Sequence, residues 1–184
     1  THLHWDHSSN MKAYKNARYI CTQKEFTWAM NPLPLYYNSY ESPVLGIEPP
    51  FTGCHFEFVD GVTEIIPGVS VFPTPGHCPG HQCVTVKTTA GDAVIVGDAI
   101  FRFENIEPNY KEKWRYWVPA RFYNSIEGWQ SVEEIDKRAD FLLLTHDERV
   151  LEHEVYPYEN MPLRKRREVI PGLSFFFGGS PASS

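Results

Sequence analysis

The chain has 184 residues, 42% of them hydrophobic and 22% charged, which is ordinary for a single globular domain. Its net charge of −6 argues against a nucleic-acid partner. No apolar run approaches the roughly 20 residues that span a bilayer, so we expect no membrane partner. Four scattered cysteines favour a reducing compartment, and we expect a cytoplasmic protein.

The chain opens with T-H-L-H-W-D-H at residues 1–7, a concentration of metal-binding side chains. Residues two apart on an extended strand point to the same face, so His2 and His4 can bind one metal ion. Asp6 and His7, just past the end of that strand, can turn toward a second ion. The spacing therefore predicts a site for two metals.

The region up to residue 73 alternates short helices and strands. We expect a short helix over about 10–16, a strand over 18–22, and a helix capped by Thr22 that runs to about Met30. Residues 31–53 contain five prolines and no clear periodicity, which predicts a long loop. A meander of short strands is then expected at 54–59, 63–66 and 69–73.

The second half places polar residues after predicted strands. The segment T-P-G-H-C-P-G-H at 74–81 forms a loop, and the strands over 82–88 and 93–97 follow it. Residues 99–130 are irregular and rich in aromatic side chains. Ser131, with Glu134 completing a capping box, predicts a helix to residue 139, and a strand over 140–145 follows.

Three of these strand-end positions carry metal-binding side chains: His77, Asp98 and His146. A turn after a buried strand is a rigid support for a ligand. Together with the opening motif, these residues complete a predicted ligand set of His2, His4, Asp6, His7, His77, Asp98 and His146.

With these motifs the chain resembles the metallo-β-lactamase superfamily, through T-H-L-H-W-D-H at 1–7, T-P-G-H at 74–77, V-G-D at 96–98 and T-H-D at 145–147. The resemblance implies an α/β fold, the αββα sandwich, with metals at one edge between two sheets. It implies one ion held by His2, His4 and His77, another held by Asp6, His7 and His146, and Asp98 as the bridging carboxylate. We expect zinc, because imidazole-rich sites suit it, with iron or manganese as alternatives.

Within this superfamily the chain is most similar to N-acyl homoserine lactonases and related hydrolases, through T-P-G-H-C-P-G-H-Q at 74–82. Phe101 departs from the lactonase pattern, which has a tyrosine three residues after the bridging aspartate. Either another tyrosine replaces it, or the substrate is not an acyl homoserine lactone. The predicted substrate-binding residues are therefore aromatic, although core packing or a subunit interface would suit them equally: Tyr36, Tyr37, Tyr40, Phe101, Trp114, Trp117 and Tyr123.

The expected reaction opens a lactone or cleaves an ester-type bond in a partly apolar small molecule, by attack of a hydroxide that bridges the two metals. Asp6 and Asp98 are the expected catalytic residues, with Asp6 passing a proton to the leaving alkoxide. His81 and Asp147 are expected to support the ligands without binding metal. Thioester or phosphotriester hydrolysis is an alternative, and a catalytically silent metal-binding subunit is an alternative of another class.

Members of this superfamily build a first sheet before the H-x-H-x-D-H loop, and residues 1–184 contain no strands for it. We therefore expect residues 1–177 to form the C-terminal two thirds of one such domain, and residues 178–184 to be a disordered tail. A companion chain from the same precursor, cut before Thr1, would supply the missing strands. Self-cleavage and an outside protease are both open, as is a homo-oligomer.

Overall fold

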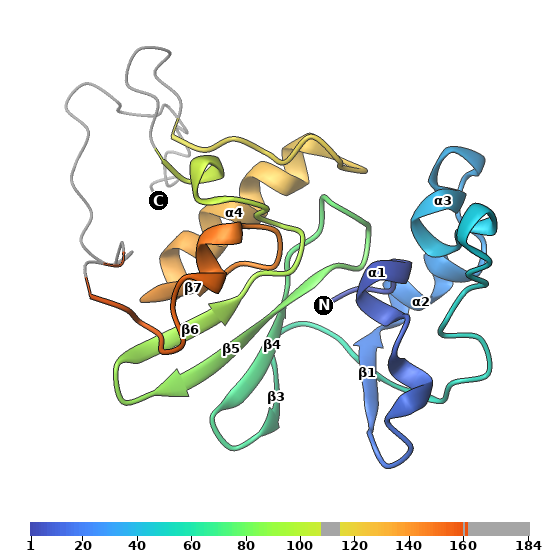
Figure 1. The fold of residues 1–184 in the computed structure, drawn as a ribbon, viewed down its shortest axis with the longest axis horizontal. Coiled ribbons are helices and arrows are strands. Elements are labelled where there is room, and N and C mark those ends of the chain that lie inside the picture. Colours follow the sequence, from blue (N-terminus) through green and yellow to red (C-terminus); the bar gives the residue numbers. More distant parts are fainter. Residues whose placement is uncertain (108–114, 160, 162–184) are drawn as a thin grey trace, which may run out of the picture.

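The computed structural model describes residues 1–107, 115–159 and 161, and its strands form two sheets (Figure 1). The smaller sheet is a parallel pair, β1 (Tyr19–Thr22) and β2 (Phe56–Val59). The larger sheet has five strands in chain order: β3 (Thr63–Ile66), β4 (Val69–Pro73), β5 (Gln82–Thr88), β6 (Gly91–Ile95) and β7 (Phe141–Leu143). β3 to β6 pair antiparallel, whereas β7 is parallel to β6.

Helices cover both sides of the molecule. The helix α4 (Ser125–Arg138) connects β6 to β7 and lies against the five-stranded sheet, and α2 (Gln23–Met30) follows β1 on the opposite side (Figure 1). The short helices α1 (Trp5–Ser8) and α3 (Tyr37–Tyr40) lie on the same side as α2, and the N-terminus lies between the two sheets. Five 3-10 turns complete the described elements: η1 (Met11–Ala13), η2 (Pro34–Tyr36), η3 (Pro43–Leu45), η4 (Phe103–Asn105) and η5 (Glu148–Leu151).

Two hydrophobic clusters hold these layers. The larger lies between α4 and the five-stranded sheet, where Val132 and Ile135 on one face of α4, and Ala139 just past its end, are 0% exposed. The smaller contains Leu3 and Tyr40 beside residues of β1 and α2. No helix in the described part of the chain is long and apolar enough to cross a membrane.

The start of α4 differs from the sequence prediction. Asn124 is the cap, because its side chain accepts hydrogen bonds from the backbone N–H groups of Ile126 and Glu127. Ser131 lies inside the helix, and its hydroxyl donates to the carbonyl of Pro75 at 2.6 Å. The predicted capping box at Ser131 is therefore wrong, and the serine joins α4 to the loop that carries His77.

Four further predictions need correction. β2 does not join the meander, because it pairs with β1. Residues 1–4 form no regular strand, and the predicted helix over 10–16 is only the turn η1. The predicted loop at 31–53 contains η2, α3 and η3. The predicted tail at 178–184 lies outside the described residues.

Candidate metal centre

Two backbone hydrogen bonds, one at Thr1 and one at Leu3, hold the opening motif in place. The carbonyl of Thr1 accepts a hydrogen bond from the N–H of Gln82 at 3.1 Å, and the N–H of Leu3 donates to Glu25 Oε1 at 3.0 Å. His2 and His4, on either side of Leu3, are both buried. The chain then turns into α1, which carries Asp6 and His7.

The loop that carries His77 is fixed by α4. Gly76 has a φ of +134°, and a Cβ there would lie 2.2 Å from Gly128 Cα, so only glycine permits this approach. The carbonyl of Gly76 accepts from the N–H groups of Tyr123 and Asn124 at 2.7 and 2.9 Å. His77 thus projects from a loop held by backbone contacts, and Asp98 and His146 follow β6 and β7.

The structure brings all seven predicted ligands together in two neighbouring groups. The first cluster consists of His2, His4, His77 and Asp98, and the second consists of Asp6, His7 and His146. Within each cluster, one ligand atom per residue lies within 4.8 Å of the others.

Asp98 faces both clusters. Its Oδ1 lies 2.9 Å from His7 Nε2 and 3.0 Å from His146 Nε2, both in the second cluster. Its Oδ2 lies 3.1 Å from His77 Nε2 and 3.9 Å from His2 Nε2, both in the first cluster. One carboxylate therefore directs one oxygen to each cluster, which is the placement that a bridging ligand needs.

The hydrogen bonds of His77 test whether this centre suits a cation. Its Nδ1 must donate to the carbonyl of Arg121 at 2.8 Å, because a carbonyl can only accept. Its Nε2 then carries a lone pair that faces Asp98 Oδ2. In addition, the buried Nε2 atom of His2 has no hydrogen-bond partner among the described residues. Converging lone pairs without protons fit a metal ion.

Burial keeps two imidazoles of the first cluster unprotonated, as metal binding requires. Burial, with a contribution from neighbouring histidines, lowers the pKa of His2 well below its usual value and lowers the pKa of His4 to about 3. Both imidazoles are therefore neutral at neutral pH and offer lone pairs. Burial alone would raise the pKa of Asp98, but its contacts with the surrounding histidines, His7 foremost, lower it, so the carboxylate is ionised.

Of the two predicted supporting residues, His81 contacts a ligand and Asp147 does not. His81 Nε2 accepts from the N–H of Asp98 at 3.1 Å, which leaves its Nδ1–H to donate to Thr74 Oγ1 at 2.8 Å. Asp147 instead accepts from the N–H of Phe103 at 2.9 Å and pairs with Arg149 at 2.7 Å. Asp147 thus joins the segment after Asp98 to the segment after His146, rather than orienting His7 or His146.

Phe101 is a predicted substrate residue that lies beside ligands of both clusters. Its ring centroid is 4.9 Å from that of His146 and 5.8 Å from that of His77. Beside it is a cavity of about 390 Å³ whose wall also includes Arg102, Pro119 and His146. This cavity opens directly onto a ligand of the second cluster.

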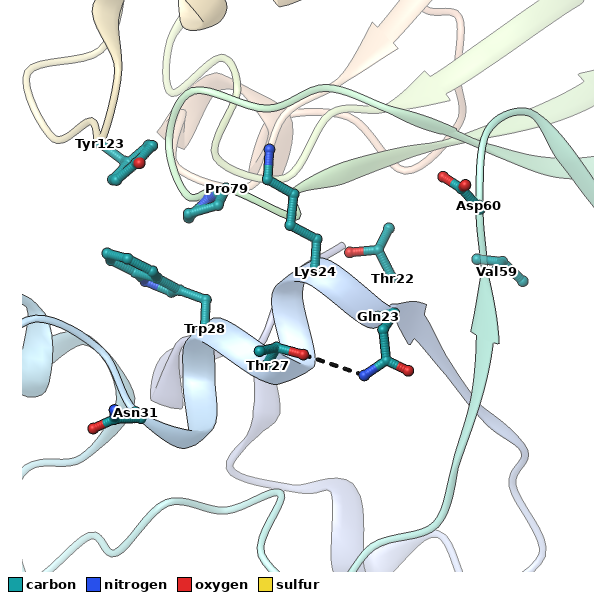
Figure 2. A pocket seen from close by; sticks show the side chains of 10 residues that line it. All are labelled: Thr22, Gln23, Lys24, Thr27, Trp28, Asn31, Val59, Asp60, Pro79 and Tyr123. Atoms are coloured by element: carbon teal, nitrogen blue, oxygen red, sulfur yellow. Dashed lines mark hydrogen bonds between the residues drawn. The ribbon is translucent and has the colours of Figure 1, made fainter.

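Tyr36 and Tyr123 lie in a different place, packed around Trp28. The Trp28 ring is 5.7 Å from Tyr36 and 5.1 Å from Tyr123 between centroids. Trp28, Tyr123 and Pro79 border one cavity of about 740 Å³. Figure 2 shows these side chains and that of Lys24, which extends beside Pro79.

The other aromatic predictions have mixed outcomes. Tyr40 does not fit a substrate-binding role, because it is 1% exposed and its hydroxyl donates to Glu25 at 3.1 Å. Its ring instead packs edge-on against His4, with centroids 4.8 Å apart. Tyr37 and Trp117 are 43% and 38% exposed, and Trp114 lies outside the described residues.

Comparison with known proteins identifies the family. The model of the Metallo-beta-lactamase superfamily matches residues 1–153. The chain belongs to this superfamily. The N-acyl homoserine lactonase AiiA of Bacillus thuringiensis subsp. kurstaki is 30% identical to this superfamily member over 108 residues, 58% of the chain and 39% of AiiA. A lactonase from Bacillus sp is 31% identical over the same length.

Solved structures agree on the fold. A B. thuringiensis AiiA variant with N-decanoyl-L-homoserine at its active site has a TM-score of 0.65 and 27% identity, covering 85% of this chain and 58% of the variant. A probable metal-dependent hydrolase from Staphylococcus aureus is 21% identical and has a TM-score of 0.64. The match covers 80% of this chain and 53% of the hydrolase. The chain thus spans less than two thirds of the length of these relatives.

Proposed function

We propose that this chain carries the active site of a dinuclear-metal hydrolase that opens a lactone or cleaves an ester-type bond in a partly apolar small molecule. The observation that supports this most is the placement of Asp98, with one carboxylate oxygen facing the histidines of each cluster. The similarity to N-acyl homoserine lactonases supports the choice of a lactone or ester over other substrates.

The residues divide the work between binding and proton transfer. The first cluster would hold one ion and the second cluster another, with Asp98 shared between them. Zinc is the expected metal, since imidazole and carboxylate donors dominate both clusters. Two such ions supply Lewis-acid activation of a water molecule and of a substrate carbonyl.

Asp6 is the group placed to move a proton. Its Oδ2 lies 3.5 Å from His7 Nε2, and its side chain is 42% exposed, so it can face both the second cluster and a bound substrate. An exposed carboxylate beside the reacting bond can accept a proton from the attacking water and return it to the leaving alkoxide. Phe101 has no hydroxyl and would contribute only an apolar wall for the substrate.

The test combines metal analysis with a substrate screen. We expect the purified protein to contain two metal ions per chain and to hydrolyse at least one class among lactones, aryl esters, thioesters and phosphotriesters, with lactones or esters preferred. Chelation should abolish turnover, and added zinc should restore it. Two bound ions without turnover of any class would favour the silent subunit, and preference for a thioester or phosphotriester would reassign the substrate.

Asp6→Asn is the sharpest variant for the proton-transfer role. It keeps the size of the side chain but removes the proton acceptor, so we expect kcat to fall by about 100-fold or more, within the range for general acid–base catalysis. Asp60→Asn, an exposed aspartate beside β2, is the matched control and should leave kcat unchanged. An unchanged kcat in Asp6→Asn would remove Asp6 from the mechanism.

A further inference from the structure

Glu25 is a buried carboxylate on α2 that neither the predicted ligand set nor the proposed mechanism uses. The residue is 0% exposed. Its Oε1 accepts hydrogen bonds from the N–H of Leu3 at 3.0 Å and from the hydroxyl of Tyr40 at 3.1 Å. Its Oε2 has no hydrogen-bond partner among the described residues. A buried acid with so few partners is costly, and its retention needs a reason.

The partners of Glu25 all adjoin histidines of the first cluster. Leu3 lies between His2 and His4 in the chain, and the ring of Tyr40 packs on His4. Both of these partners are themselves buried.

The fit of α2 against the loop after His77 is equally close. A Cβ on Gly80 would lie 2.1 Å from the backbone nitrogen of Glu25, so only glycine allows this approach. The hydroxyl of Thr22, the cap of α2, donates to the carbonyl of Gly80 at 2.8 Å. The start of α2 is therefore held against the loop, with the Glu25 carboxylate beneath the first cluster.

We propose that Glu25 is a positioning residue for the first cluster, fixing the backbone and rings around His2, His4 and His77 so that their nitrogens converge on one ion. This inference rests on the proposed metal centre. Glu25 acts through Leu3, Tyr40 and the loop at Gly80, and does not itself bind the metal. None of its described hydrogen bonds is to Asp6, His7 or His146, so its effect should be confined to the first cluster.

Two single variants allow the zinc affinity of each cluster to be measured separately, and the Glu25 substitutions are made in each of these two backgrounds. His146→Ala removes a ligand of the second cluster and leaves the first to be titrated, whereas His4→Ala does the reverse. We expect Glu25→Ala to weaken zinc binding by about 10- to 100-fold in the His146→Ala background, the usual loss when a partner of a metal ligand is removed. In the His4→Ala background the zinc affinity should be unchanged. Glu25→Gln retains an acceptor for Leu3 and should lose less than about 10-fold.

Asp136 provides the matched control. It is also buried, at 4% exposed, and accepts a hydrogen bond from a buried tyrosine, Tyr116, at 2.7 Å, but it lies on α4. Asp136→Ala should destabilise the fold without changing zinc affinity in either background.

Four results would overturn the positioning role: equal losses in both backgrounds, no loss in either, a similar loss with Asp136→Ala, or failure of both Glu25 variants to fold, which would assign Glu25 to the fold alone. Absence of zinc binding by the unsubstituted protein would instead refute the metal centre itself, so the two failures are distinguishable.

Discussion

The two clusters offer the same kinds of ligand in opposite surroundings. In the first cluster every residue is buried, with His2 and Asp98 4% exposed and His4 and His77 5% exposed. In the second cluster the side chains of Asp6 and His146 are 42% and 37% exposed. One half of the candidate centre therefore lies inside the protein, and the other half faces solvent.

This difference in exposure indicates that the buried cluster is suited to holding a metal ion and the exposed cluster to admitting a substrate. The buried His77 is oriented by a fixed backbone group, the carbonyl of Arg121, which accepts from its Nδ1–H. The open cluster is carried by the short helix α1 and the end of β7, next to the cavity lined by Phe101. We therefore expect the first cluster to bind its ion more tightly, and the second to exchange its ion and to contact the substrate.

The largest expected effect comes from removing the residue that the clusters share. Asp98→Ala should lose metal at both clusters and reduce hydrolysis to the uncatalysed rate, because each cluster loses a ligand oxygen and the charge that balances its ion. Elemental analysis and turnover would be measured together. Asp92→Ala, on β6 and paired with Lys87, is the control and should retain both ions. Retention of one ion by Asp98→Ala would show that the carboxylate serves only one cluster.

Single-cluster variants test the burial contrast directly. His4→Ala empties a buried site that packs against Tyr40, so we expect the metal-free protein to lose about 1–3 kcal/mol of unfolding free energy. His146→Ala alters an exposed side chain and should change that free energy by no more than about 0.5 kcal/mol. Denaturant unfolding of both metal-free variants would be compared with the unsubstituted protein. Equal losses would contradict the idea that only one cluster is structurally embedded.

The sequence was sufficient to predict that these seven residues come together, because so many imidazole and carboxylate groups in short motifs make chance a poor explanation, although any one of them alone would be read as structural. β3, β4 and β5 also begin and end where alternation and turn residues place them. Such features are local, so each can be recognised without knowledge of its neighbours in space.

Features that depend on distant partners were not predictable in this way. The alternation in Phe56–Val59 suits pairing with β1 or with β3, and only tertiary packing selects β1. Glu25 has the sequence context of an ordinary polar residue in the first turn of a helix, and its burial follows from how α2 meets Leu3 and Gly80. The role of Asp147 changed for the same reason, since Arg149 and Phe103 were not evident as its partners.

A smaller effect on zinc affinity is expected from weakening the hydrogen bond that His81 accepts from the backbone N–H of Asp98. Thr74→Val keeps the shape of the side chain but leaves His81 Nδ1–H without its acceptor, so the ring that holds the N–H of Asp98 is less well fixed. Since Asp98 serves both clusters, both zinc affinities should fall together, each by about 10-fold. Thr63→Val on β3 is the control. A loss confined to one cluster would show that the two ends of Asp98 are positioned independently.

The smallest expected effect concerns the missing lactonase hydroxyl. Phe101→Tyr adds a hydroxyl to a ring that contacts His146 of the open cluster and His77 of the buried one. If acyl homoserine lactones are substrates, one added hydrogen bond to the substrate carbonyl should raise kcat/KM by about 2- to 10-fold, the equivalent of roughly 0.5–1.5 kcal/mol. The exposed Phe122→Tyr should have no effect. A gain with lactones and not with aryl esters would place the lactone beside the open cluster, whereas an unchanged kcat/KM with intact metal content would indicate that the substrate carbonyl lies away from residue 101.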